Sequence, residues 1–124
     1  MSTLLKYANA HFATMPILVG TAILIRPDSI APFMFKNAPL PSADTEIVDI
    51  LLKGFAIRDI YLGISLWAAI ATGSRKVIGF CLLGGLGVAA VDGYALHQAL
   101  GRGLIDHWAF LPVLLVCGVT QAFS

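Results

Sequence analysis

The chain has 124 residues, of which 58% are hydrophobic and 12% are charged, and its net charge is +1. This composition is more apolar than a water-soluble domain of that length can bury, so we expect a multi-pass integral membrane protein. The small net charge and the lack of a basic run argue against nucleic acid as a partner. We predict an all-α, integral membrane four-helix bundle, a single domain over residues 1–124 with spans near residues 4–25, 46–72, 77–100 and 106–124.

The first span, residues 4–25, contains Asn9, His11 and Pro16 and ends at Arg26-Pro27 without the small-residue pattern of a cleavage site. We therefore expect a retained span and not a signal peptide. The ring of Pro16 clashes with the preceding turn of a helix, which predicts a kink.

The segment at residues 27–44 holds several prolines around the apolar run Ile30–Phe35. Phe33 and Phe35 would leave a costly apolar patch if they faced water. We expect this segment to lie in the membrane interface as a lid over one mouth of the bundle.

The second span, residues 46–72, carries Arg58 and Asp59 near its middle. A charged side chain at the centre of a spanning helix costs about 2.5–3.5 kcal/mol on insertion scales, so it is normally turned inward, paired and functional. Tyr61 and Ser65 follow Arg58 at spacings of three and seven residues and share its helical face. We predict that this face points into the bundle and that Arg58 and Asp59 are catalytic residues.

The third span, residues 77–100, has small residues at every fourth position, Gly85, Ala89 and Gly93. Such a stripe lets a neighbouring backbone approach closely. We therefore expect this helix to be the most closely packed of the four, and a homo-oligomer could form along the same stripe.

A tight connection around Ser74 joins the second and third spans, so two residues at equal depth in these antiparallel helices have numbers whose sum is about 149. Asp92 in the third span therefore lies at the depth of Arg58. This placement predicts an Arg58–Asp92 ion pair. Asp59 points about 100° away from Arg58 on the helix and is expected to find a different partner. A carboxyl group left over in an apolar interior would keep its proton and could donate it. Asp59 and Asp92 are thus both candidate catalytic groups.

Four further side chains are candidates for substrate binding: Tyr61, His11, Tyr94 and His97. If Arg26 lies level with Glu46, then His11 falls beside Tyr61. For all four, an ordinary packing role inside the bundle remains an open alternative.

The fourth span, residues 106–124, opens with Asp106-His107-Trp108, and Trp108 is typical of a membrane interface. Cys81 and Cys117 lack the spacing of a metal or redox site, so we expect both to be small core side chains. No metal, nucleotide or flavin motif is found in the sequence, so we expect no metal and no cofactor.

Several short runs together resemble a family of small four-span membrane proteins of bacteria and filamentous fungi that is known only as a domain of unknown function. The runs are LLKGFAIRDIYLGISLW, SRKVIGF, AAVDGYALHQALG and DHW, and the resemblance covers about residues 45–110. They supply a G-x-x-x-R-D pattern ending in Arg58-Asp59, the basic Arg75, the pair Asp92-Gly93 and the pair His107-Trp108. The fungal relatives are similar to membrane proteins encoded among natural-product enzymes, which implies a lipophilic substrate.

The first functional hypothesis is an intramembrane, cofactor-independent enzyme. Asp59 or Asp92 would transfer a proton to a lipophilic polyene, epoxide or carbonyl compound, giving cyclisation or isomerisation, while Arg58 and Tyr61 orient the substrate. The alternative is a non-catalytic membrane module that binds a lipophilic ligand or assembles as a subunit, in which Arg58 and Asp92 are a purely structural pair. A proton-coupled transporter is a weaker third alternative, because the chain has no internal repeat. The expected partners are a lipophilic small molecule and membrane lipid.

Overall fold

The computed structural model describes residues 2–27, 45–101 and 108–124 of the chain. These ranges contain four helices and no strand: α1 (Thr3–Ile25), α3 (Thr45–Thr72), α4 (Arg75–Leu100) and α6 (Leu111–Ala122). The predicted all-α class is therefore confirmed. The lid predicted from Ile30–Phe35 and the helix start predicted at His107 lie outside the described residues.

Three of the helices, α1, α3 and α4, are long and apolar enough to cross a membrane. The fourth, α6, has 12 residues, which make about 18 Å of helix against a hydrocarbon core of about 30 Å. The helix α6 begins at Leu111, and Asp106, where the sequence pattern predicts the start of the fourth span, lies outside the described residues. Pro112 stands in its first turn, where a missing N–H group costs no helical hydrogen bond.

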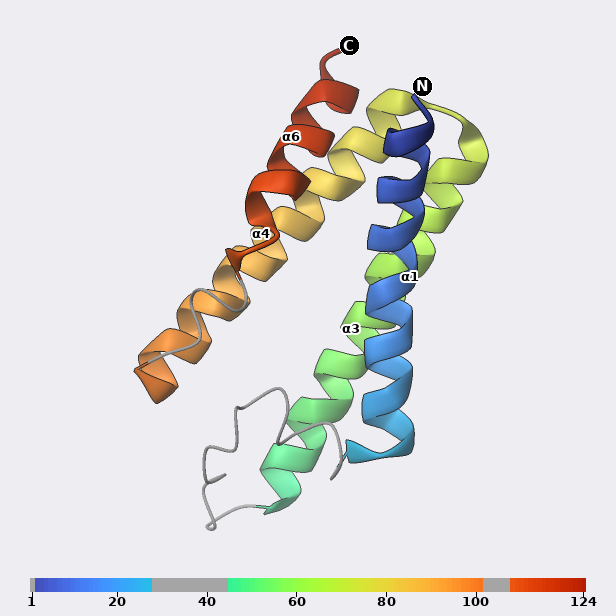
Figure 1. Cartoon of the computed structure of the whole chain (residues 1–124). Coiled ribbons are helices and arrows are strands. Elements are labelled where there is room, and N and C mark those ends of the chain that lie inside the picture. The colour runs from blue at the N-terminus through green and yellow to red at the C-terminus, as the bar shows by residue number, and fades with distance from the viewer. Residues whose placement is uncertain (1, 28–44, 102–107) are drawn as a thin grey trace.

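The helices form two pairs, α1 with α3 and α4 with α6, which diverge from the turn between α3 and α4 (Figure 1). Both termini lie at the end of the molecule where this turn is found. The turn is short because Gly73 adopts a positive φ of 70°, a backbone conformation that costs glycine little. The hydroxyl of Ser74 then accepts a hydrogen bond from the Val77 N–H group and caps α4. The tight connection predicted from the sequence is confirmed.

Glycine permits the close approach of α1 and α3. A Cβ atom added at Gly20 would collide with the carbonyl oxygen of Ala56, and one added at Gly63 would collide with Ile17 and with the carbonyl oxygen of Ala13. Substitution at either position would therefore push two backbones apart.

The small-residue stripe of α4 has a different role from the predicted one. A Cβ atom added at Gly85 would meet no atom within 4 Å, and Gly85 and Ala89 both line a cavity between the helix pairs. At Gly85 the expectation of a close helix contact is therefore wrong, because the helix pairs diverge and leave Gly85 and Ala89 facing that cavity, whereas Gly93 is buried. The close contact of α4 is made instead by Gly79, which lies against Ala122 of α6.

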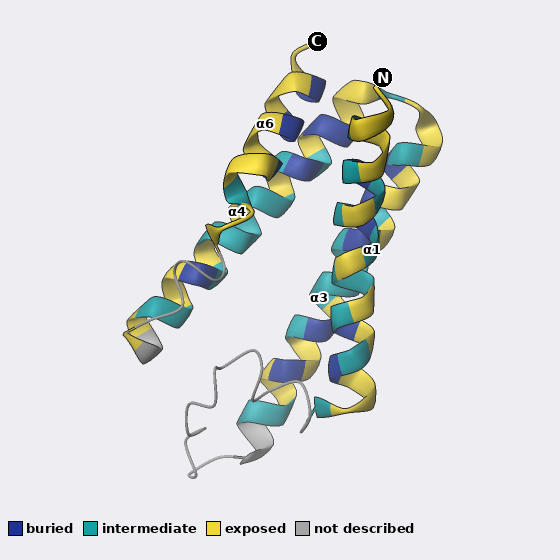
Figure 2. Ribbon diagram, in the orientation of Figure 1, coloured by how far each residue is buried: buried dark blue, intermediate teal, exposed yellow. Residues whose placement is uncertain are grey.

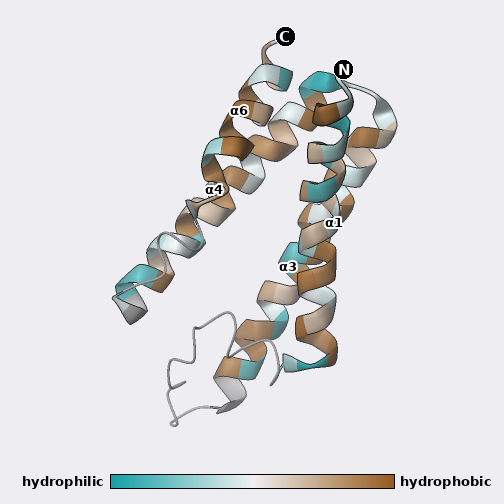
Figure 3. Ribbon diagram, in the orientation of Figure 1, coloured by the Kyte–Doolittle hydropathy of each residue, from teal (hydrophilic) through white to brown (hydrophobic). Residues whose placement is uncertain are grey.

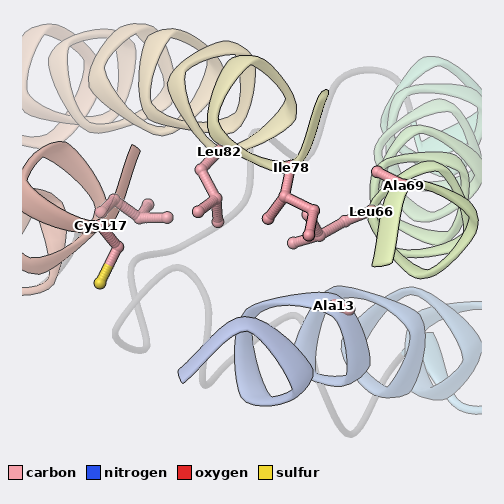
Figure 4. Packing of buried hydrophobic residues seen from close by; sticks show 7 residues of the cluster. Ala13, Leu66, Ala69, Ile78, Leu82 and Cys117 are labelled. Atoms are coloured by element: carbon pink, nitrogen blue, oxygen red, sulfur yellow. The ribbon is translucent and has the colours of Figure 1, made fainter. Parts of the chain in front are cut away.

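A cluster of buried side chains joins all four helices near the α3–α4 turn (Figure 4). Its members are Ala13, Leu66, Ala69, Ile78, Leu82, Leu114 and Cys117. The prediction that Cys117 is a small core side chain is confirmed, and Cys81 is partly buried against the same cluster.

A buried amide pair ties α1 to α6 at this end of the molecule. The Asn9 Nδ2 donates to Gln121 Oε1 at 2.8 Å, and Gln121 Nε2 donates to Asn9 Oδ1 at 3.0 Å. Gln121 Nε2 also donates to the carbonyl oxygen of Cys117 at 3.0 Å. Both side chains are buried, so these bonds fix the position of α6 against α1 where no water competes.

The outer faces of the helices carry large exposed apolar side chains, such as Leu18, Ile57 and Val91 (Figures 2 and 3). A water-soluble protein rarely exposes so much contiguous apolar surface, whereas lipid tails solvate it. The surface therefore agrees with the lengths of α1, α3 and α4.

Candidate functional site

A cavity of about 630 Å³ lies between the two helix pairs and receives side chains from all four helices. Its size falls within the range of about 300–1,000 Å³ that is usual for small-molecule sites. Most of the lining side chains are apolar: Phe12, Met15, Pro16, Val19, Phe55, Leu62, Leu66, Leu82, Val88, Leu96, Phe110 and Leu114. The charged side chains on its wall are Arg58, Asp59 and Asp92.

Arg58 and Asp92 form a bidentate ion pair between α3 and α4. Arg58 Nη1 donates to Asp92 Oδ1 at 2.8 Å, and Arg58 Nη2 donates to Asp92 Oδ2 at 2.7 Å. Two parallel bonds of this kind fix orientation as well as distance. The contact predicted from equal depth is confirmed.

Asp59 belongs to the same network, contrary to the expectation that it needs a different partner from Arg58. Its Oδ1 accepts a hydrogen bond from Arg58 Nη2 at 3.0 Å and another from Nε at 3.4 Å. Consecutive helical residues do point apart, but the guanidinium stands on a long, flexible stem and can turn one edge towards Asp59. Arg58 therefore holds two carboxylates at once.

Phe55 covers the guanidinium. Cζ of Arg58, the central carbon of the guanidinium, lies 4.0 Å from the centroid of the Phe55 ring. Phe55 precedes Arg58 on α3 by about one helical turn. A cation over an aromatic face is attracted to the ring electrons, and the contact also shields the charge from lipid. Phe55 is not among the site residues predicted from the sequence, although its spacing of three residues from Arg58 is a usable signal.

His11 lines the cavity, as its candidate role requires, but at a different level from the predicted one. The contacts of Gly20 with Ala56 and of Gly63 with Ala13 displace α1 along α3 by more than one helical turn from the register in which Arg26 lies level with Glu46. His11 therefore does not lie beside Tyr61. The long segment between α1 and α3 leaves their register open in the sequence, unlike the tight turn between α3 and α4.

The other three candidate binding residues are not found among the cavity-lining side chains. The expectation that Tyr61 faces inward is wrong, since it is 69% exposed on the outer side of α3. Tyr94 is 53% exposed, and its hydroxyl accepts a hydrogen bond from Gln98 Nε2 at 2.8 Å. His97 is half-buried near the end of α4, with its Nδ1 buried and not hydrogen-bonded.

Cys81, Gly85 and Ala89 of α4 also line the cavity. Within residues 2–27, 45–101 and 108–124, no three histidine, cysteine or carboxylate side chains come together in a group that could hold a metal ion. The described site therefore offers two carboxylates, one guanidinium, the imidazole of His11 and the thiol of Cys81 beside a mostly apolar space.

Residues 13–121 match the family described as Domain of unknown function (DUF4267), and the chain belongs to this family. No curated protein and no solved structure matches the chain. The matched range includes the whole Arg58, Asp59 and Asp92 network, as well as Phe55.

Proposed function

We propose that this DUF4267 protein is an intramembrane enzyme that binds a lipophilic small molecule in the cavity and transfers a proton on it without a cofactor. One observation carries the proposal: Arg58, Asp59 and Asp92 form a single network on the wall of a mostly apolar cavity. An ion pair that only fixes helix register needs neither a second carboxylate nor a cavity beside it. Convergent polar groups in an apolar pocket are the usual arrangement of a ligand site.

The network supports proton removal as the first step. Every hydrogen bond that Arg58 donates within the network ends on a carboxylate oxygen, so Asp59 and Asp92 lie in the network as hydrogen-bond acceptors, and proton removal requires an acceptor oxygen. A carboxylate oxygen of Asp59 or Asp92 would take a proton from a carbon beside a carbonyl group or double bond, and the electron pair of that C–H bond would move into the adjacent π system. Return of the proton at another carbon completes an isomerisation with no net oxidation or reduction. Cyclisation can proceed through the same proton transfer, on a lipophilic substrate of the kind that the family resemblance implies.

A non-catalytic role is the second candidate, and the bidentate geometry favours it. Arg58 engages both oxygens of Asp92, so the pair also holds α3 against α4 across the cavity. In that case the protein binds a lipophilic ligand, or assembles as a subunit, and performs no chemistry on it.

Binding in the cavity can be tested with two neighbouring glycines of α4. A Cβ atom added at either Gly84 or Gly85 meets no atom within 4 Å, but Gly85 lines the cavity and Gly84 is exposed. Gly85→Leu should fill the cavity and abolish binding of prodan, a neutral fluorescent naphthalene probe, while Gly84→Leu should bind it as the wild type does. Equal binding by both variants would show that the probe sits elsewhere.

Catalysis can then be separated from binding with Asp59→Asn and Asp92→Asn, which keep the shape of each side chain and remove its proton chemistry. Lipophilic ketones, polyenes and epoxides are incubated in heavy water with each protein, and deuterium incorporation or rearrangement is followed by mass spectrometry. An enzyme should lose exchange or turnover in at least one variant while prodan binding survives. Probes that bind but are never exchanged or converted by the wild type would favour the non-catalytic candidate.

A further inference from the structure

We infer that the cavity binds a lipophilic alcohol or phenol, whose polar group is a hydroxyl, and that it excludes carboxylates and phosphates. This inference rests on the proposed function, because it concerns the ligand of the same cavity. It runs against the simplest expectation from an arginine in an apolar site, which is an anionic ligand.

The guanidinium of Arg58 has little capacity left for an anion. A guanidinium carries five N–H groups, and Arg58 makes four hydrogen bonds, two to Asp92 and two to Asp59. The ring of Phe55 lies over one face of the group at 4.0 Å. An anionic ligand would have to displace a carboxylate from Arg58 and then lie beside that carboxylate in an apolar space, where like charges repel strongly.

Asp92 offers the opposite chemistry. Each of its oxygens accepts one hydrogen bond from Arg58, whereas a carboxylate has about four lone-pair sites in total. Asp92 lines the cavity, and its side chain is 16% exposed. A ligand group that meets the Asp92 carboxylate can form a hydrogen bond with it only by donating one. A hydroxyl donates one and brings no charge, so it satisfies the carboxylate without disturbing Arg58.

The apolar wall sets the rest of the ligand. Phe12 and Phe110 line the cavity together with aliphatic side chains. The ligand should therefore be a hydrocarbon body with one hydroxyl end, which Asp92 holds at the α4 wall.

Competition against prodan tests this with three probes of similar size: 1-dodecanol, 1-methoxyundecane and dodecanoate. The assay is run in detergent near pH 8, where the acid is ionised. A hydrogen bond to a charged group contributes about 1.5–3 kcal/mol. The inhibition constant of dodecanol against prodan should therefore be at least about tenfold lower than that of the ether or the carboxylate. In Asp92→Asn the preference for the alcohol over the ether should fall, while Gly84→Leu should keep it.

The outcomes separate this inference from the proposed function. If dodecanoate competes as well as dodecanol, or the ether matches the alcohol, the inference is overturned, while loss of prodan binding in Gly85→Leu still supports a ligand cavity. If Gly85→Leu binds every probe as the wild type does, the cavity is not the binding site and both fail. The comparison of dodecanol with the ether and with dodecanoate is made on the wild type. It therefore tests the inference even if Asp92→Asn does not fold.

Discussion

Arg58 and Asp92 meet across the space between two diverging helix pairs, with Arg58 Nη1 at 2.8 Å from Asp92 Oδ1 and Nη2 at 2.7 Å from Oδ2. Arg58 lies near the middle of α3, and the matching carboxylate lies on α4, about 26 Å of helix beyond the connecting turn. The pair therefore joins the two helix pairs at a level where little backbone contact between α3 and α4 remains (Figure 1).

Arg58→Leu should destabilise the protein by about 3–5 kcal/mol, because it leaves two carboxylates in an apolar site without their guanidinium. Unfolding in a fixed detergent, followed by circular dichroism over a denaturant series, measures the loss. Lys53→Leu is the control: Lys53 pairs with Asp49 on the exposed surface of the same helix, so its loss should cost less than about 1 kcal/mol. Adding Asp92→Leu to Arg58→Leu should recover part of the stability, and a double variant as unstable as the sum of the singles would speak against the pair.

Gly20→Ala should loosen the contact between α1 and α3. The added methyl group would meet the carbonyl oxygen of Ala56 and, at 2.8 Å, Cγ1 of Ile60, and the backbone atom cannot move aside without shifting the helix. Overpacking of this kind costs about 1–3 kcal/mol. Gly84→Ala makes the same change where no atom lies within 4 Å, and it should gain up to about 1 kcal/mol of helix propensity. Thermal unfolding of the two variants side by side should give shifts of opposite sign, and equal shifts would contradict the close approach of α1 and α3.

Asn9→Leu should lower stability by about 1–3 kcal/mol, because it leaves the buried amide of Gln121 without a partner on α1. Replacing both Asn9 and Gln121 with leucine removes the unpaired group and should restore part of the loss. A double-variant cycle on unfolding free energies measures the coupling between the two positions. A coupling energy near zero would mean that the amides do not bond to each other in the membrane protein.

Gly73→Ala should cost about 1–2 kcal/mol, since alanine is strained at the observed φ of 70°. Asparagine tolerates this region better, so Gly73→Asn should lie between the wild type and Gly73→Ala. Unfolding measurements on the three proteins give the order, and an alanine variant as stable as the wild type would rule out the positive φ.

The sequence predicts those parts of the site that depend on a short connection. Arg58 and Asp92 could be paired in advance because the turn at Gly73 fixes the register of α3 against α4. The register of α1 could not be obtained in this way, because a long segment separates it from α3 and leaves glycine contacts such as Gly20 with Ala56 to decide it. His11 was therefore placed beside Tyr61, which in fact faces outward.

The face of a helix is harder to infer in a membrane protein than in a soluble one. Apolar residues are found on all sides of α3 and α4, so hydrophobic periodicity does not separate the inner from the outer face. The spacing of Gly85, Ala89 and Gly93 predicts a helix contact, although Gly85 and Ala89 border the cavity. The Asn9 and Gln121 pair was missed because the two positions are far apart in the sequence and belong to helices that no short connection joins.

The helices long enough to cross a membrane, α1, α3 and α4, all contribute residues to the wall of the cavity between the helix pairs. A lipophilic ligand of this cavity is dissolved in the surrounding hydrocarbon, so its occupancy follows its mole fraction there and not its concentration in water. At a constant amount of ligand, adding detergent or lipid should therefore dilute the ligand and raise every apparent Kd or KM that is expressed per litre of solution. The same constants should stay fixed when they are expressed as the mole fraction of ligand in the detergent or lipid. Kinetic constants of this protein should therefore be given as mole fractions.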